Sequence, residues 1–426
     1  ALVERLSVDE RFVHRHRDPP RPAAHAEPLR PLPDGLVDDD RRCWSHQAAA
    51  IDALREGCSV VLTTPTGSGK SLCYQVPAIE AAAAGRKTLM VFPTKALAHD
   101  QLQTLAAAAP RGVTVAAYDG DCSPQERTWV RRHADIVLTN PEMLHLGILS
   151  NKDRWEDFLR HLELVVVDEL HVLRGLFGSH AAHVFRRLRR LVRAFGGSEP
   201  TFAFTSATIG SPEELARRIS GIDPLVIAGS GAPTGERTTV LWNPQEGAVG
   251  EEGMRPSLNI ETATVAAEAA AAGLRTLVFC RSRHATELVA NEVRVRLGQH
   301  GIADASQLVR SYRAGYLADE RRSIELALAE GRLSCVVATS ALELGIDVDG
   351  LDAVVLSGFP GTIASFRQQV GRAGRGSRSA LAILVAGEDQ LDQWMMRHPR
   401  EAFRRPPEAA VVNPANPHVL HPHLGC

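Results

Sequence analysis

The chain has 426 residues, of which 44% are hydrophobic and 23% are charged, the balance of an ordinary globular protein. Its formal net charge of −2 excludes an overall basic excess, so any site for a polyanion must be a local patch. No apolar run reaches the roughly 18 residues that a transmembrane helix needs, and the charged N-terminus shows no signal peptide. We therefore expect a cytoplasmic protein without a membrane partner.

The length exceeds that of one typical domain, so two domains with appendages are expected. The cysteines include no C-x-x-C pair, which predicts reduced, scattered thiols rather than a disulfide frame or a complete zinc site. They stand at positions 43, 58, 73, 122, 280, 335 and 426. The abrupt start at Ala1 and stop at Cys426 suggest a fragment of a longer protein.

Prolines and glycines mark three segments that we expect to lie outside the main domains. Prolines recur among charged residues from Pro19 to Pro33, and this composition predicts an extended arm over residues 1–36. Residues 230–257 are rich in Gly, Pro and Glu around one possible strand, Arg237–Trp242, and predict a linker. The proline-rich tail 397–426 is expected to leave the second sheet and begin another region.

Between these segments, short β-rich apolar runs alternate with helical or loop segments. This alternation predicts the α/β class, with parallel sheets wrapped by helices, in one domain over residues 37–229 and another over 258–396. The strands expected in chain order are Ser59–Thr64, Thr88–Phe92, Ile136–Thr139, Leu164–Val167 and Thr201–Phe204, followed by Thr276–Cys280, Ser334–Ala338, Ala353–Ser357 and Ala380–Val385.

A phosphate-binding loop is predicted where T-P-T-G-S-G-K-S follows the first apolar strand and precedes a helix-compatible run. Gly67 and Gly69 let backbone N–H groups turn toward phosphate oxygens. Lys70 would supply a positive charge to the β- and γ-phosphates, and the Ser71 hydroxyl would reach Mg²⁺. Thr64 replaces the usual first glycine, and a chance G-K-S after a strand is the alternative.

Two carboxylates, Asp168 and Glu169, end the apolar run that begins at Leu164. Open parallel sheets bind their ligands at the carboxyl ends of their strands. Asp168 would hold Mg²⁺ together with Ser71, and Glu169 would polarise the attacking water. An Asp-Glu pair that merely caps the next helix is the alternative, but its position downstream of a phosphate loop favours catalysis.

The segment Asp168-Glu-Leu-His171 is similar to the D-E-x-H box of superfamily 2 DEAD/DEAH-box helicases, and the rest of that motif set stands in order along the chain. The other motifs are Trp44–Gln47, Phe92–Leu97, Thr139–Glu142, Ser206–Thr208, Val278–Arg283, Thr339–Asp347 and Gln368–Arg375. The resemblance covers about residues 36–390. It implies two tandem RecA-like P-loop domains with a cleft between them, and an ATP hydrolase that moves along a nucleic acid.

The resemblance also implies roles in the ATP site. Gln47 would read adenine, and Arg372 and Arg375 would reach across the cleft as arginine fingers, although surface salt bridging is the alternative for both. Nucleotide would be bound by Gln47, Thr66, Gly67, Ser68, Gly69, Lys70, Ser71, Gly345 and Asp347. Catalysis would involve Lys70, Asp168, Glu169, Gln368, Arg372 and Arg375.

The residues that the family implies would contact a nucleic-acid strand have small polar or cationic side chains suited to phosphate oxygens. Each is equally plausible as a helix cap or a solvated charge. They are Thr94, Lys95, Asn140, Arg281, Arg283 and Thr339. The segment Val184–Arg193 has a helical apolar stripe, and its arginines are interpreted as a solvated face rather than a nucleic-acid face.

The run Asp168–His180, which contains R-G-L-F-G-S-H, resembles bacterial and fungal DNA-repair helicases related to RecQ, including the SftH and mitomycin-repair types. The segment Asn413–Cys426 resembles the start of their C-terminal accessory region, most of whose four-cysteine metal cluster this chain would lack. The resemblance implies ATP and Mg²⁺ as cofactors and 3′-to-5′ movement on single-stranded DNA. It further implies unwinding of partly duplex DNA in repair by a monomer at the bacterial nucleoid.

Two alternatives share the same motor motifs. One is an RNA helicase, which would need contacts to the 2′-hydroxyl or tolerance of the A-form shape. The other is a nucleic-acid-stimulated ATPase or translocase that does not separate strands. The motifs predict ATP hydrolysis in all three cases, whereas the choice of DNA depends on the R-G-L-F-G-S-H signature.

Overall fold

The computed structural model describes residues 2–33, 42–207, 209–244, 256–313, 316, 318–343, 350–374 and 376–426. The chain divides into two compact units. The first, called here the ATP-site unit, contains Ala24–Ala232 and Glu408–Cys426; the second contains Ala1–Ala23 and Pro233–Pro407. Within the described ranges, no helix combines the length and apolarity that crossing a membrane would require.

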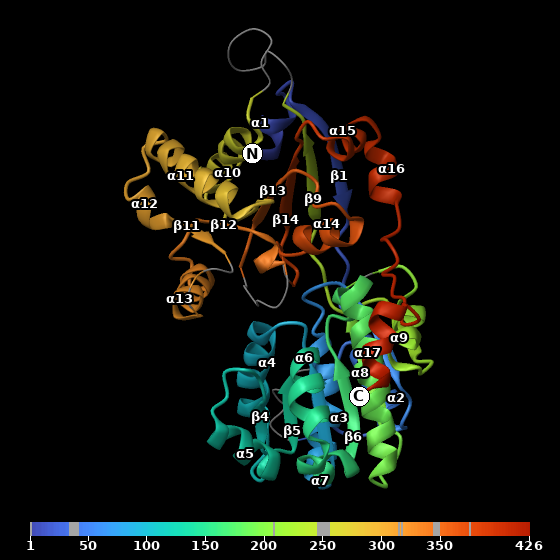
Figure 1. Cartoon of the computed structure of the whole chain (residues 1–426). Coiled ribbons are helices and arrows are strands. Elements are labelled where there is room, and N and C mark those ends of the chain that lie inside the picture. The colour runs from blue at the N-terminus through green and yellow to red at the C-terminus, as the bar shows by residue number, and fades with distance from the viewer. Residues whose placement is uncertain are drawn as a thin grey trace. The chain divides into compact units, whose positions relative to one another are not determined.

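The ATP-site unit is built on a parallel sheet whose central strands are buried on both faces, as parallel sheets wrapped by helices usually are (Figure 1). In spatial order its strands are β4 (Val115–Ala117), β5 (Ile136–Thr139), β3 (Lys87–Val91), β6 (Leu162–Val167), β7 (Thr201–Ser206), β2 (Val60–Thr63) and β8 (Leu225–Ala228). The expected strands of this domain are confirmed, and the structure adds the short β4 and β8. Both were missed because each is short and partly exposed.

Helices cover both faces of this sheet. Residues of α2 (Ser45–Arg55), α3 (Lys70–Ala83) and α4 (Lys95–Ala108) join one buried cluster with the strands. On the other face, Phe185 of α8 (Gly175–Ala194) packs against Phe202 of β7, with 6.2 Å between ring centroids. The remaining helical elements are α5 (Pro124–His133), α6 (Pro141–Met143), η1 (Leu144–Ile148), η2 (Leu149–Arg154), α7 (Glu156–Arg160), η3 (Leu170–Val172), α9 (Pro212–Ser220) and α17 (Pro417–Leu424).

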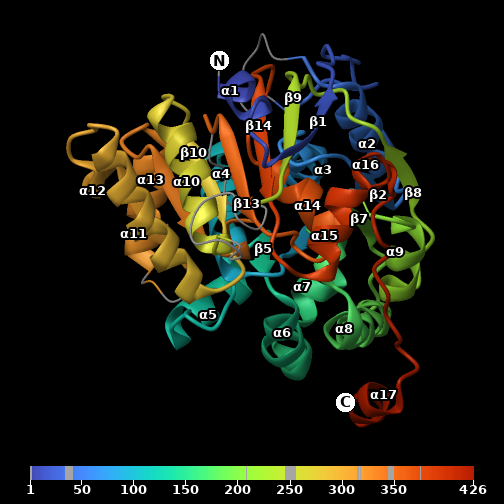
Figure 2. The ribbon, with the colours of Figure 1, turned by 90° about the horizontal axis from the view of Figure 1, so that it is seen from above.

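The second unit repeats this architecture with one antiparallel edge strand. Its spatial order is β1 (Phe12–Asp18), β9 (Arg237–Trp242), β14 (Ala380–Val385), β13 (Ala353–Ser357), β10 (Thr276–Phe279), β12 (Cys335–Ala338) and β11 (Val309–Tyr312). On one face, α10 (Leu258–Ala271) and α11 (Arg283–Gln299) lie side by side, as Figures 1 and 2 show. The other helices are α1 (Leu2–Ser7), α12 (Ala305–Leu308), α13 (Ala318–Ala329), η4 (Ser340–Leu342), α14 (Ile363–Val370), α15 (Gln390–Arg397) and α16 (Pro399–Arg404).

The structure corrects three expectations about the segments outside the domains. The extended arm was wrong for residues 2–18, where α1 and β1 form and β1 pairs antiparallel with β9. The linker was wrong for Arg237–Trp242, because β9 lies inside the sheet between β1 and β14. The tail was wrong for residues 397–407, which stay with the second unit, whereas Glu408–Cys426 belongs to the ATP-site unit. That the tail begins a further region stays a prediction. The ends of the arm and of the linker fall partly on residues 34–41 and 245–255, outside the described ranges.

Candidate active site

The phosphate loop joins β2 to α3, and two of its glycines, Gly67 and Gly69, have a positive φ. Gly69 precedes α3 with a φ of 65°, in the left-handed region that favours glycine. A Cβ on this residue would lie 2.7 Å from Nε2 of Gln47 and 2.8 Å from the ring of Trp44. Because α3 begins at Lys70 directly after this turn, its first N–H groups are available to an anion.

Two side chains of α2 hold this loop. Nε2 of His46 donates to the carbonyl of Ser68 at 2.9 Å, and its Nδ1 accepts from the N–H of Gly231 at 3.1 Å. Burial lowers the pKa of His46, which keeps the ring neutral in this tautomer. Nε2 of Gln47 donates to the carbonyl of Gly69 at 2.9 Å. The motif W-S-H-Q therefore frames the loop, a role that sequence reasoning missed for His46, while adenine recognition by Gln47 remains a prediction.

Lys70 and Thr64 stand at the two ends of the loop in the sequence but contact each other in the structure. Nζ of Lys70 donates to the carbonyl of Thr64 at 2.9 Å. The Thr64 side chain is fully buried, and its Oγ1 lies 2.5 Å from Oγ of Ser68. The hydroxyl of Thr64 thus closes the loop from inside, which explains how a threonine can replace the usual first glycine.

Asp168 directly follows β6 and is largely buried. Its Oδ1 accepts from the hydroxyl of Thr205 on β7 and from the N–H of Glu169 at 3.0 Å. Burial and the neighbouring Glu169 raise the pKa of Asp168 to about 6, against the opposing effect of the Thr205 bond. A carboxylate that is held by fixed donors and has a perturbed pKa is typical of a functional site.

Glu169 has the left-handed φ of 50°, which is uncommon for a residue with a Cβ. Its side chain is only 14% exposed, and Oε2 has no hydrogen-bond partner among the residues that the structure describes. The Nδ1 atom of His171 lies 3.4 Å from this oxygen. A buried carboxylate oxygen without a donor is costly, so its presence fits a group that binds a water or an ion.

His171 also connects this motif to the short Ser206–Thr208 motif. The N–H of Ala207 donates to Nδ1 of His171 at 3.4 Å, and Oγ of Ser206 lies 3.5 Å from the same nitrogen. Thr208 lies outside the described residues. The loops that follow β6 and β7 are therefore joined through one imidazole.

In the ATP-site unit, the residues predicted to contact a nucleic-acid strand follow β3 and β5, which are neighbours in the sheet. Thr94 caps α4, where its Oγ1 accepts from the N–H of Leu97 at 3.3 Å. Asn140 caps α6, where its Oδ1 accepts from the N–H of Met143 at 2.9 Å. The structure thus shows Thr94 and Asn140 as helix caps, and their contact with nucleic acid remains a prediction.

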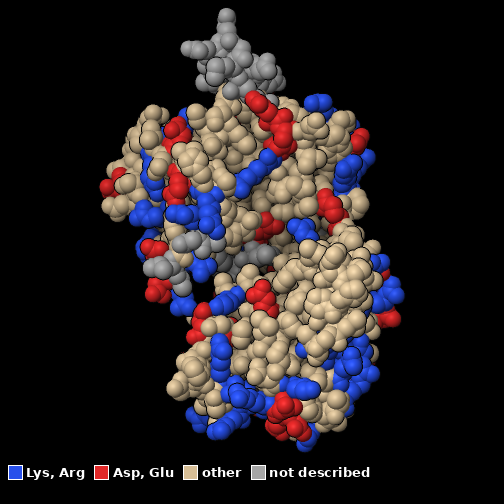
Figure 3. Space-filling view, in the orientation of Figure 1, with Lys and Arg blue, Asp and Glu red and all other residues tan. Residues whose placement is uncertain are grey.

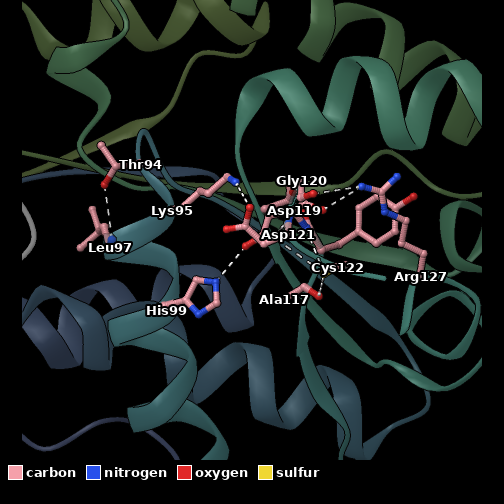
Figure 4. A network of polar contacts seen from close by, with 12 residues as sticks. Thr94, Lys95, Leu97, His99, Ala117, Asp119, Gly120, Asp121, Cys122 and Arg127 are labelled. Atoms are coloured by element: carbon pink, nitrogen blue, oxygen red, sulfur yellow. Dashed lines mark hydrogen bonds and ion pairs between the residues drawn. The ribbon is translucent and has the colours of Figure 1, made fainter. Parts of the chain in front are cut away.

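Lys95 is exposed at the start of α4 and pairs with an acidic loop after β4 (Figure 4). Its Nζ lies 2.7 Å from Oδ1 of Asp121, and Asp121 raises the pKa of Lys95. The loop is anchored by the buried Asp119, whose Oδ2 lies 2.8 Å from Nε2 of His99 and whose Oδ1 accepts from the N–H of Asp121 at 2.8 Å. The predicted phosphate-binding lysine is therefore held beside a carboxylate.

In the second unit, Arg281 ties loops together. Its Nη2 donates to Oδ1 of Asp392 at 2.8 Å and to the carbonyl of Phe359 at 2.9 Å, and its Nη1 pairs with Asp389. Asp392 is fully buried. Arg281 thus has a structural role that the sequence did not indicate.

The other predicted residues of this unit differ in exposure. Arg283 is exposed at the start of α11, and Thr339 caps η4 through a bond from the N–H of Ala341 at 3.4 Å. Gln368 and Arg372 are 4% and 5% exposed, and Nη2 of Arg372 donates to the backbone carbonyl of Glu343. Gly345, Asp347 and Arg375 lie outside the described residues, so their roles stay predictions.

Basic side chains do not gather in one large patch on the face that Figure 3 shows, where Lys and Arg are interspersed with Asp and Glu. Four of the arginines of α8 have partners within their own unit, consistent with a solvated helix face. Arg186 donates to the carbonyl of Arg218, Arg187 to Nδ1 of His145, and Arg189 to the carbonyl of Ser220, while Arg189 and Arg193 pair with Glu199.

Residues 44–215 match the DEAD/DEAH box helicase family, and residues 261–377 match the helicase conserved C-terminal domain. The uncharacterized ATP-dependent helicase YprA of Bacillus subtilis is 40% identical over all of this chain and 57% of its own length. The ATP-dependent helicase HRQ1 of Saccharomyces cerevisiae is 41% identical over 90% of this chain and 37% of its own. A crystal structure of the DUF1998 helicase MrfA bound to DNA is 38% identical with a TM-score of 0.91, over all of this chain and 57% of that one.

The chain thus spans about half the length of these relatives. The ordered motifs, the two α/β units and the matches confirm the resemblance on which the expected fold was based. The chain belongs to the DEAD/DEAH box helicases of superfamily 2, in the branch that contains YprA, HRQ1 and MrfA.

Proposed function

We propose that this chain is the motor of an ATP-dependent DNA helicase, which moves 3′ to 5′ along single-stranded DNA and unwinds duplex DNA in repair. The observation that carries the hydrolytic part is the buried Oε2 of Glu169, which accepts no hydrogen bond from the residues that the structure describes. It lies next to an Asp168 with a raised pKa and downstream of a framed phosphate loop. A purely structural role would leave such an oxygen uncompensated.

Phosphoryl transfer requires positioning and charge stabilisation more than covalent chemistry. Lys70 and the first N–H groups of α3 would bind the phosphates, since they converge at the loop. Glu169 would orient the attacking water through its buried Oε2. In the proposal, Arg372 and Arg375 supply further positive charge during hydrolysis, and Gln368 belongs to the same motif.

The donor set at the end of β6 fits Mg²⁺, which prefers carboxylate and hydroxyl oxygens. Ser71 and Asp168 would hold it, and when bound it would neutralise charge that develops on the phosphates. Asp168 must be ionised to do so, and its bonds from Thr205 and from the N–H of Glu169 both favour the ionised form.

DNA as the track is supported by relatives rather than by a basic surface. MrfA was solved bound to DNA, and a Mycobacterium smegmatis Lhr helicase, 28% identical with a TM-score of 0.72, was solved bound to single-stranded DNA and AMP-PNP. In the proposal, Thr94, Lys95, Asn140, Arg281, Arg283 and Thr339 contact the strand backbone. The protein would act as a monomer on single-stranded or partly duplex DNA at the nucleoid.

The experiment that tests this proposal measures ATP turnover with single-stranded DNA, with single-stranded RNA and without polynucleotide, for wild type and Glu169→Gln. We expect stimulation by DNA and none in the variant. Stimulation by RNA alone would replace the DNA helicase with an RNA helicase. A DNA-stimulated ATPase that fails to separate 3′-tailed duplexes would leave a translocase.

A further inference from the structure

The C-terminal segment Glu408–Leu424 lies along the ATP-site unit, at the start of α8. The N–H of Gly175 donates to the carbonyl of Val411 at 2.8 Å, and Gly175 and Val412 pair as a parallel bridge. The N–H of Asn413 donates to Oγ of Ser179 at 2.9 Å. Successive backbone groups of the segment are thus matched by groups of the α8 N-terminus.

The fit is also steric. A Cβ on Gly178 would lie 2.5 Å from Cγ1 of Val412 and 2.3 Å from the carbonyl oxygen of Leu173. Val412 is 1% exposed, whereas its neighbour Val411 is 67% exposed. The second glycine of R-G-L-F-G-S-H therefore leaves the space that one side chain of the segment fills.

The same segment reaches the loop that follows β7. Gly210 and Ala409 form a parallel bridge, and the N–H of Gly210 donates to the carbonyl of Glu408 at 3.3 Å. Gly210 stands shortly after Ser206–Thr208, and Gly175 shortly after η3. Residues 408–412 therefore contact both the loop that follows β7 and the loop that leads from β6 to α8. His171 connects the same two loops through its contacts with Ala207 and Glu169.

The far end of the segment is held by histidines. Nε2 of His183 donates to the carbonyl of Pro414 at 2.8 Å. Nε2 of His423, on α17, lies 2.9 Å from Nδ1 of His180. The ring of His423 also lies 4.9 Å from that of His183 and 5.3 Å from that of His145, centroid to centroid. The signature and the helix that follows it thus contact the segment over most of its length.

We propose that Glu408–Leu424 is a strap, that the signature Arg174–His180 is its docking site, and that the docked strap positions the loops carrying Glu169 and Ser206–Ala207 for hydrolysis. The inference rests on the proposed function for its catalytic consequence only. Val412, Gly178 and Ser179 are then positioning residues that touch neither ATP nor the strand. The signature that resembles the DNA-repair branch serves, on this account, the chain's own C-terminal segment.

The test is Val412→Asp, which places a charge in a dry contact and should release the strap. Its matched control is Val411→Asp, with the same charge on the exposed neighbour. Hydrogen exchange should rise in residues 168–175, 206–212 and 408–414 of Val412→Asp only. The kcat of ATP turnover should fall about tenfold, while the KM for ATP stays unchanged because the strap does not contact the phosphate loop.

Ser179→Ala provides a milder second variant, in case Val412→Asp fails to fold. It removes the acceptor of the Asn413 N–H and should shift exchange and kcat in the same direction by a smaller factor. The proposal is overturned if the strap is released while exchange at 168–175 and kcat both stay at the wild-type level. A wild-type chain without ATP turnover would contradict the proposed function, and the exchange data would still decide the strap.

Discussion

The ATP site and the nucleic-acid contacts predicted at the start of α4 are built in opposite ways. Around Lys70, Asp168 and Glu169, side chains are buried or framed by bonds from several elements. Thr94 and Lys95, in contrast, are exposed, and their side chains form a local helix cap and a surface ion pair. Hydrolysis benefits from dipoles fixed in advance in a dry site. Residues that must bind and release a nucleic-acid strand in every ATP cycle benefit from weak, solvated contacts.

This difference predicts that substitutions at the ATP site change ATP turnover strongly, whereas substitutions at the predicted nucleic-acid contacts change DNA affinity only a little. The experiments below are ordered accordingly. For Lys70 and Thr205, a control variant from the same unit allows a general loss of folding to be recognised.

Lys70→Ala should reduce ATP turnover to background. The loss should exceed the roughly 10²- to 10³-fold cost of one missing stabilising donor, because phosphate binding fails as well. Steady-state hydrolysis measures this, with the exposed Lys152→Ala as control. Turnover that survives in Lys70→Ala would contradict the phosphate-loop assignment.

Glu169→Gln should still bind ATP but hydrolyse it about 10²-fold or more slowly, because the amide cannot take a proton from water. A fluorescent ATP analogue measures binding, and single-turnover kinetics measure the chemical step. If the variant loses nucleotide binding instead, Glu169 supports the structure of the site rather than the reaction.

Turnover should fall as the pH drops through about 6, because protonation of Asp168 removes the charge that would bind Mg²⁺. Thr205→Val deletes a donor that favours the ionised carboxylate, so it should raise the pKa of Asp168 and move the acid limb to higher pH by about one unit. Thr201→Val, at the other end of β7, is the control. An acid limb that does not move would remove Asp168 as its source.

Lys95→Ala should weaken single-stranded DNA binding by less than about tenfold and lower the salt dependence of binding by about one ion. Asp121→Asn should tighten binding by about two- to fivefold, because it removes a carboxylate that competes with phosphate. Fluorescence anisotropy across a salt series measures both. If Asp121→Asn acts equally in a Lys95→Ala background, its effect does not pass through Lys95.

The strands and motifs that the sequence predicted are those with local signals. The buried runs before Lys70 and before Asp168 are apolar, so their strands and the site at their ends could be inferred. β1 was missed because its F-V-H-R-H-R-D pattern is mostly polar and it pairs with a strand more than 200 residues away.

The framing of the phosphate loop by His46 and the docking of Val412 were missed for a related reason. Both depend on contacts between distant segments, and a histidine in a helix or a valine in a tail carries no local signal of its partner. The capping roles of Thr94 and Asn140 were among the alternatives, since residues of these types cap helices.

A motor that moves along DNA must couple ATP binding to DNA binding. The most direct test of the proposed function therefore compares the affinity of Glu169→Gln for single-stranded DNA with and without ATP. The variant should trap the ATP-bound state, with Lys70→Ala as the control that cannot respond. The account predicts a DNA affinity that differs several-fold between the two conditions, with a reciprocal change in ATP affinity. Equal affinities with and without bound ATP would contradict it.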